Sequence, residues 1–236
     1  MNIAFAHSKG GVTKSALASN LCVWLHMKGH HVAAIDLDAG EHGNKSLTTS
    51  VAQAEPGIPI FQPESPEELR TLLPQLAEEF HFTVADAPGG FQSTAQTNIE
   101  LLKHSDFVLI PVKPEFDAIE PLTVVERIIC EARFENPLLE ARVIVNCLDG
   151  RTRIGRDPAS VVALVHSVCP KLKVMQQKVR IDSSAFQTAR INGSVVVQGT
   201  RSPAFEDLNT LFAELMSDMI VSINRHSQKL AATSNG

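Results

Sequence analysis

The fold of this chain is constrained most by one segment near its start, residues 7–15, with the sequence HSKGGVTKS. Its last two residues, Lys14 and Ser15, end the segment as phosphate-binding loops end, because the ammonium reaches the β and γ phosphates of a nucleotide and the hydroxyl reaches Mg²⁺. An apolar run typical of a buried parallel strand precedes the segment, and a stretch with helical spacing follows it until Gly29. This order places the positive end of a helix dipole against phosphates, so the sequence predicts a nucleotide site.

Two residues of this segment depart from the usual phosphate-binding loop. Lys9 is a second lysine directly before the glycine pair, although Lys14 already supplies a cation for one nucleotide. Thr13 occupies a position that is usually glycine, and its Cβ resists the positive φ angle that glycine adopts freely. We therefore expect nucleotide binding with slow hydrolysis; the alternative is a solvated turn with two surface lysines. The nucleotide-binding residues expected in the segment and directly after it are Lys9, Gly10, Gly11, Val12, Thr13, Lys14, Ser15 and Ala16.

The string KGGVTKS at residues 9–15 resembles the deviant Walker A loop of the ParA/MinD family of dimerising ATPases, and the resemblance extends from residue 2 to about residue 223. No DNA-binding extension precedes the loop, so we expect the short form found in ParA-type plasmid and chromosome partition ATPases. The resemblance implies that ATP and Mg²⁺ are the cofactors and that the ATP-bound chain forms a homodimer. It also implies that Lys9 touches the phosphates held by the second copy.

Three aspartates follow strand-like runs. Asp36 and Asp38 lie two residues apart near the end of one run, and Asp86 ends another, before the sequence APGG. By resemblance to the family, Asp38 orients the attacking water, and a Walker B aspartate binds Mg²⁺, an ion that needs few protein carboxylates. The alternative is that Asp36 and Asp38 only cap the following turn. The implied catalytic set is Lys9, Lys14 and Asp38, and the implied metal set is Ser15, Asp36 and Asp86.

A later apolar run ends in Asn146, at the place where the family often has a residue that contacts adenine. An asparagine amide offers the edge of a base both a donor and an acceptor. The alternative is an asparagine that merely forms a turn. The following loop carries Arg151, Arg153 and Arg156, which either face DNA or the base or form a solvated surface loop.

The distribution of charge bears on DNA binding. The net charge is −5, which argues against strong binding of nucleic acid by the chain as a whole. Residues 171–201, however, contain six basic residues and one acid. This local excess suits weak contacts to phosphates that do not depend on sequence, and the alternative is a set of scattered surface cations. The candidate DNA-binding residues are Lys171, Lys173, Arg180, Arg190 and Arg201.

Apolar strand-like runs alternate with helical stretches along nearly the whole chain, which predicts an α/β fold. We expect a single-domain P-loop NTPase over residues 1–227, with a mostly parallel twisted sheet and helices on both faces, and a flexible C-terminal tail over 228–236. The predicted strands are residues 2–7, 31–36, 82–86, 107–112, 142–147, 172–175 and 194–198. The predicted helices are residues 15–28, 66–80, 91–103, 119–133, 158–168 and 203 to about 225.

Several classes of protein are disfavoured. The chain has no run of 18 apolar residues and begins without a basic stretch before an apolar core, so we expect no membrane span, no secretory signal and a cytoplasmic location. Its last residues lack the basic, aromatic pattern of a membrane-binding helix. The four cysteines have no metal-binding spacing and are expected to behave as small core residues.

These features leave three functional hypotheses. The first is a Mg-ATP-dependent dimerising ATPase that partitions DNA, such as a plasmid; it would bind non-specific DNA on the nucleoid when ATP is bound, and a ParB-like centromere-binding or activator protein would stimulate hydrolysis. The second is a positioning or conjugation accessory ATPase of the same superfamily with a protein cargo. The third is a weakly hydrolysing, nucleotide-gated binding module, and Thr13 is the residue that favours it.

Overall fold

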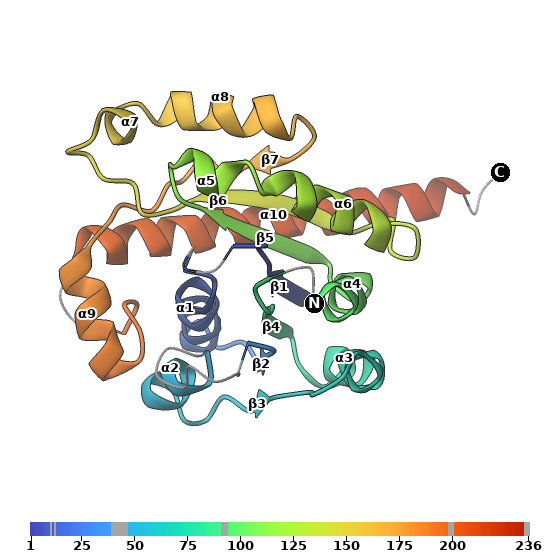
Figure 1. The fold of residues 1–236 in the computed structure, drawn as a ribbon. Helices are drawn as coiled ribbons and strands as arrows, with labels where there is room; N and C mark the ends of the chain where they lie inside the picture. The colour runs from blue at the N-terminus through green and yellow to red at the C-terminus, as the bar shows by residue number, and fades with distance from the viewer. Residues whose placement is uncertain (10, 12, 39–46, 91–93, 198–200, 234–236) are drawn as a thin grey trace.

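The computed structural model describes residues 1–9, 11, 13–38, 47–90, 94–197 and 201–233, and the statements below concern these residues. Their strands form one seven-stranded sheet in the order β3-β2-β4-β1-β5-β6-β7, and every pairing is parallel (Figure 1). The fold class predicted from the sequence is therefore confirmed. The strands are β1 Asn2–Phe5, β2 Val32–Asp36, β3 Ile60–Phe61, β4 Phe82–Asp86, β5 Phe107–Val112, β6 Glu140–Val145 and β7 Lys173–Val174.

Helices cover both faces of the sheet, which is why the central strands are buried along their whole length. Side chains of α1, α2, α9 and α10 pack on one face, and those of α3, α4, α6 and α8 pack on the other. The helices are α1 Lys14–Met27, α2 Leu47–Ala54, α3 Pro66–Glu79, α4 Ala95–Lys103, α5 Phe116–Ile119, α6 Leu122–Ala132, α7 Arg153–Arg156, α8 Pro158–Val168, α9 Ser183–Asn192 and α10 Pro203–Thr233.

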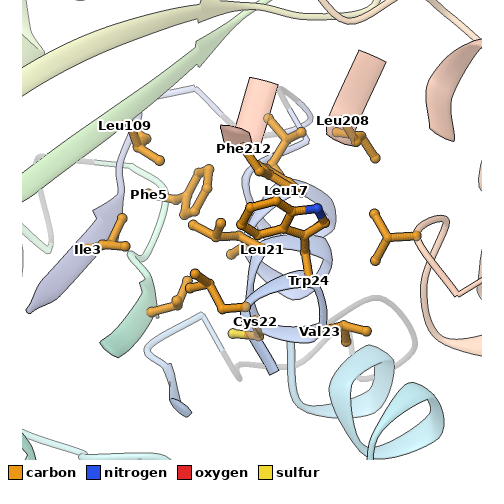
Figure 2. Close-up of a cluster of buried hydrophobic side chains, with 14 of the residues drawn as sticks. Ile3, Phe5, Leu17, Leu21, Cys22, Val23, Trp24, Leu109, Leu208 and Phe212 are labelled. Atoms are coloured by element: carbon orange, nitrogen blue, oxygen red, sulfur yellow. The ribbon is translucent and has the colours of Figure 1, made fainter. Parts of the chain in front are cut away.

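The core on the α1 face fixes the helix that follows the phosphate-binding segment. Leu17, Leu21 and Trp24 of α1 point between the strands and α10 (Figure 2). The Trp24 ring lies 5.8 Å from that of Phe212, and its indole N–H donates a hydrogen bond of 2.9 Å to Asn209 of α10. Each fully buried large apolar side chain contributes about 1.5–3 kcal/mol, so this packing holds α1 firmly against β1.

One predicted strand is wrong, and one predicted helix begins later than expected. Residues 194–198 were expected to form a strand, but the described residues 194–197 form a turn, buried at 194–196, whose hydrogen bonds go to a side chain; residue 198 lies outside the described residues. The Asn20 Oδ1 of α1 accepts from the Ser194 hydroxyl at 2.8 Å and from the N–H groups of Val195 and Val196 at 2.8 and 3.2 Å. The helix expected over 119–133 is present as α6, which begins three residues later than predicted, after Pro121, and the short helix α5 precedes it.

The ends of the chain's helices also differ from expectation. The boundary predicted at residue 227 falls inside α10, which continues to Thr233, so most of the expected tail is helical. The sequence patterns do not predict α2, β3, α5, α7 or α9. Part of the helix expected over 91–103 lies outside the described residues, and α4 begins at Ala95. Within the described part of the chain, no helix has the length and apolar character needed to cross a membrane.

Candidate functional site

The predicted site residues meet at the carboxyl edge of the sheet. Asp86 at the end of β4 pairs in register with Phe5 of β1 on one side and with Asp36 of β2 on the other. The phosphate-binding segment follows β1 directly, so it emerges beside β4, which carries Asp86 and separates β1 from the Asp36 strand β2. Ligands of parallel α/β sheets bind at this edge, which is where the sequence predicts the nucleotide.

Lys14 is the central cation of this edge. It is the first residue of α1 and is buried, and its Nζ lies 4.0 Å from the Asp38 carboxylate. A Cβ built at Gly89, in the loop after β4, would lie 3.8 Å from the same Nζ. The backbone N–H of Gly90 donates to the Ser8 carbonyl at 3.1 Å, which ties this loop to the phosphate-binding segment. The APGG sequence therefore lies beside the lysine that is expected to bind phosphate.

Thr13 adopts the conformation that the sequence analysis expects of a glycine. Its φ and ψ angles are 71° and 27°, in the left-handed region. The Nδ2 of Asn146 donates a hydrogen bond to the Thr13 hydroxyl, and the Oδ1 of Asn146 accepts from the N–H of Cys147 at 2.8 Å. Cys147 also has a positive φ, 57°. Both polar groups of Asn146 thus have partners within the chain, while a role in contacting adenine stays a prediction.

Asp86 is a buried carboxylate that makes no ion pair with the described residues. It has no exposed surface, and neither of its oxygens accepts a hydrogen bond of normal geometry from the described residues. Burial raises the pKa of Asp86 to about 7, and the nearby Ser15 hydroxyl and Lys14 ammonium oppose this rise. A buried charge of this kind is costly unless a counter-charge arrives. The orphaned carboxylate beside a serine hydroxyl fits the hard oxygen ligands that Mg²⁺ prefers.

Asp36 has a different set of contacts. One of its oxygens accepts from the N–H and the hydroxyl of Thr48, at 3.0 and 2.6 Å, and the other accepts from the N–H of Asp38 at 3.2 Å. It therefore holds the start of α2 and the turn after β2, as the capping alternative predicts. The Asp38 side chain is 46% exposed and stands at the cleft beside Lys14. Asp36 is thus buried and holds the neighbouring backbone, whereas the carboxylate of Asp38 is accessible.

A cleft of about 440 Å³ lies over the start of α1. Gly11, Thr13, Lys14, Ser15, Ala16 and Asp38 line it from the predicted site, and Gly10 and Val12 lie outside the described residues. The opposite wall is formed by residues that the sequence analysis missed, because the pattern at 47–54 does not predict α2 and nothing places α9 beside it. These residues are Thr49, Ser50 and Gln53 of α2, Phe186 and Ala189 of α9, and Gly193.

Gly193 is the residue at which α9 approaches α2 in this wall. Its φ is +81°, and a Cβ at this position would lie 2.4 Å from the Ser50 carbonyl oxygen and 2.5 Å from the Ala54 nitrogen. Only glycine allows the end of α9 to approach α2 this closely. A second cleft, of about 430 Å³, lies at the start of α9, between residues 148–151 and 180–183.

Lys9 does not line the cleft among the described residues. Its Nζ donates to the carbonyl oxygen of Asp117 in α5, at 3.3 Å. The two lysines of the segment therefore have different surroundings: Lys14 is buried beside Asp38, and Lys9 extends to a helix outside the cleft. The expectation that Lys9 touches phosphates held by a second copy stays a prediction.

The candidate DNA-binding residues do not form one patch. Lys173 pairs in register with Arg142 near the amino end of β6, whereas Arg180 bridges to Leu148, beyond the carboxyl end of β6. Arg180 also makes two close contacts, of 2.8 Å each, with the buried carboxylate of Asp207 in α10. Lys171, Lys173 and Arg201 are exposed, and the side chain of Arg190 lies outside the described residues.

The fold and the site together define a nucleotide-binding protein of the P-loop class: a parallel sheet, a lysine and a serine at the start of the first helix, and carboxylates at the ends of two neighbouring strands. The chain belongs to the CobQ/CobB/MinD/ParA nucleotide binding domain family, whose model matches residues 3–227. This confirms the family inferred from the loop.

Known proteins of the family resemble the chain along most of its length. The chain is 24% identical over 217 residues to the maintenance of carboxysome distribution protein A of Halothiobacillus neapolitanus, covering 91% of this chain and 95% of that protein. It is 26% identical over 182 residues to the chromosome-partitioning ATPase Soj of Thermus thermophilus, covering 65% and 72%. The structure of the septum site-determining protein MinD with Mg-ADP from Pyrococcus horikoshii superposes with a TM-score of 0.68 at 16% identity, covering 94% and 98%, and so shares the fold.

Proposed function

We propose that this protein is a Mg²⁺-dependent ATPase that dimerises when ATP is bound and uses the ATP cycle to partition DNA. The observation that carries the proposal is the separation of the two lysines. Lys14 is buried at the cleft, while Lys9, two residues after His7 in the same loop, extends to α5. Because Lys9 does not line the cleft of its own chain, its ammonium is available to a nucleotide bound by another molecule. A second copy of this chain would hold such a nucleotide.

Within one copy, different residues bind the nucleotide, hold the metal ion and act in hydrolysis. Lys14 binds the phosphates, with the positive end of α1 behind it. Ser15 and Asp86 would hold Mg²⁺, which neutralises charge on the phosphates. Asp38, accessible and 4.0 Å from the Lys14 ammonium, orients the attacking water, and Asp36 positions Asp38 through the hydrogen bond to its N–H. Thr13 keeps the reaction slow, because its side chain in the left-handed region alters the geometry of the loop.

ATP and Mg²⁺ are proposed because the site has the groups that both require. The MinD structure named above contains Mg-ADP, and its fold matches 94% of this chain. The orphaned Asp86 carboxylate supports the same assignment from the chain's own residues. Removing Mg²⁺ with a chelator is expected to abolish hydrolysis and to lower the affinity for ATP, while the unfolding temperature changes little.

DNA partition is the first candidate for the cargo, because residues 171–201 are basic and Soj is named a chromosome-partitioning ATPase. A protein cargo is the second, because the relative that the chain matches over 91% of its length is named for carboxysome distribution. Co-sedimentation with non-specific duplex DNA at low and high salt separates them. ATP-dependent, salt-sensitive binding supports DNA partition, and absence of binding at low salt supports a protein cargo.

The dimer itself is tested by light scattering with ATP, a non-hydrolysable analogue or ADP. We expect dimers with ATP and with the analogue and monomers with ADP. Lys9→Ala should abolish the dimer while retaining ADP binding, and Lys14→Ala should weaken nucleotide binding itself. Lys113→Ala is the matched control, because it removes a lysine near α5 that the proposal does not use. A dimer of the Lys9→Ala protein as strong as that of the wild type contradicts the proposal.

A further inference from the structure

His7 is a buried imidazole that the proposed chemistry leaves without a role. It follows β1 by two residues and has no exposed surface. Its Nδ1 accepts a hydrogen bond of 2.9 Å from the backbone N–H of Lys9, and its Nε2 lies 3.0 Å from the carbonyl oxygen of Ala118 in α5. A backbone N–H only donates and a carbonyl only accepts, so these partners select the neutral tautomer with its hydrogen on Nε2.

The same helix receives two further contacts from this part of the loop. The Lys9 ammonium donates to the carbonyl of Asp117, and the Ser8 hydroxyl donates to the carbonyl of Pro121 just beyond α5, at 3.4 Å. The backbone of Lys9 is therefore linked to α5 through the imidazole, while its side chain reaches α5 directly. These two links are independent, because the ammonium can leave Asp117 without disturbing the hydrogen bond at the backbone.

We infer that His7 is a positioning residue for Lys9: it fixes the backbone from which the Lys9 ammonium moves from Asp117 to a nucleotide held by a second copy. This inference rests on the proposed function. A lysine side chain is long and flexible, so the position that its ammonium reaches is defined only if its backbone is held. His7 holds the backbone N–H and leaves the side chain free to exchange partners.

The surroundings of His7 keep it in the state that this role requires. Burial lowers the pKa of His7 to about 4, the Ala118 carbonyl opposes the change, and the positive charges of Lys14 and Lys9 add to it. From α5 the group that faces the imidazole is the backbone carbonyl of Ala118, while the acidic side chains of Glu115 and Asp117 are exposed. Protonation would replace the acceptor at Nδ1 by a donor facing another donor.

Substitutions can separate the two nitrogens of the ring. In His7→Asn the side-chain oxygen lies where Nδ1 lies and can still accept from the Lys9 N–H. In His7→Gln the terminal amide reaches toward Ala118, and His7→Leu keeps neither contact. The measurement is the dissociation constant of the dimer formed with a non-hydrolysable ATP analogue. The affinity for ADP and the unfolding temperature are measured on the same proteins.

We expect His7→Leu to weaken the dimer about tenfold, because a buried N–H loses its acceptor, and to change ADP affinity by less than about twofold. His7→Asn should recover most of the lost dimer affinity. In a Lys9→Ala background, His7→Leu should have no further effect on dimerisation, because there is no ammonium left to position. If His7→Leu does not fold, His7→Gln replaces it, since it also lacks the acceptor at the Nδ1 position.

Several results would overturn the inference. They are an unchanged dimer constant in folded His7→Leu, equal losses in His7→Asn and His7→Leu, and a loss of ADP affinity as large as the loss of dimer affinity. In each of these cases Lys9→Ala still loses the dimer, and the proposed function stands without His7. A wild-type protein that forms no dimer with ATP or its analogue removes both proposals at once.

Discussion

The side-chain amide of Asn146 donates a hydrogen bond to the hydroxyl of Thr13, and this contact joins the end of β6 to the phosphate-binding loop. Thr13 has a positive φ, which costs a residue with a Cβ about 1–2 kcal/mol. A net hydrogen bond contributes about 0.5–1.5 kcal/mol, which offsets most of that cost. The non-glycine residue is therefore tolerated in the loop because a residue 133 positions away supplies its hydroxyl with a partner.

Substitutions at Thr13 test this balance. Thr13→Ser keeps both the hydroxyl and the unfavourable φ and should change the free energy of unfolding little, whereas Thr13→Ala keeps the strain and leaves the buried Asn146 amide without its acceptor. We expect Thr13→Ala to cost about 1–3 kcal/mol in urea unfolding. Thr13→Gly removes the strain and the hydrogen bond together, so it should be close to neutral in stability and should raise ATP turnover. Equal stabilities of the Ser and Ala variants would contradict the account.

Asp86→Asn should stabilise the metal-free protein at pH 8. The pKa of Asp86 is raised to about 7 from its ordinary value of 3.8, so the unfolded chain releases its proton first, and this group lowers stability as pH rises from about 4 to 7. Removing the charge should raise the free energy of unfolding by on the order of 2 kcal/mol at pH 8 and by much less at pH 4. The same change should abolish Mg²⁺-dependent hydrolysis. A destabilised variant at pH 8 would show that Asp86 has a partner in the free protein.

His7 should give the opposite dependence on pH. Its folded pKa of about 4 lies below the ordinary value of 6.5, so its contribution to stability is complete above pH 6.5 and is lost as pH falls toward 4. His7→Asn does not titrate in this range. The difference in unfolding free energy between the wild type and this variant should therefore shrink from pH 7 to pH 4. A difference that is constant with pH would show that His7 titrates normally in the folded chain.

Asp38→Ala should retain binding of ATP and Mg²⁺ and lose most of its turnover, so that an ATP-bound dimer accumulates. The carboxylate acts on the attacking water, and its loss affects the transition state more than the ground state. Asp36→Ala is the contrasting variant, because it frees the N–H and hydroxyl of Thr48 and should lower the unfolding temperature. Turnover of the Asp38→Ala protein at the wild-type rate would reduce Asp38 to a residue of the turn.

Arg180 should prove structural and is a poor probe of DNA binding. Its guanidinium pairs with Asp207, and Arg180→Ala leaves that buried carboxylate without its main partner, at a cost of about 1–3 kcal/mol. The exposed residues Lys171, Lys173 and Arg201 are better tests. Replacing all three by alanine should keep the unfolding temperature, weaken binding to any duplex and flatten its salt dependence. Unchanged DNA affinity in this triple variant would move the interface to Arg151, Arg153 and Arg156.

Local sequence patterns were sufficient to predict the strands that lie in the middle of the sheet and are buried on both faces. The strands ending at Asp86 and Val112 were predicted to the residue, because continuous apolar runs of this length are typical of parallel strands buried on both faces. The same rule failed for the strand predicted at residues 194–198, of which the structure describes 194–197. Their hydrogen-bond acceptor is Asn20, a residue on α1 more than 170 positions earlier, and nothing in the local pattern reveals it.

Some residues of the candidate site could likewise be placed from the sequence, and others could not. The loop, Lys14 and Asp86 could be placed from motif and spacing, since each lies at the end of a predicted strand or the start of a predicted helix. The contacts of Asp36 and Arg180 could not be placed in this way, because their partners, Thr48 and Asp207, lie far away in the sequence. A charged residue in a suggestive position looks the same in sequence whether its partner is a ligand or the protein itself.

The close approach at Gly193 has a mechanical meaning for the cleft. Helix α2 is held at its start by the bonds from Thr48 to Asp36, and near its end it lies against Gly193, with no room for even a methyl group between them. A displacement of α2 toward α9 is therefore a displacement of α9 as well. Helix α2 therefore couples Asp36, which lies beside the accessible Asp38, to the wall of the cleft that α9 forms.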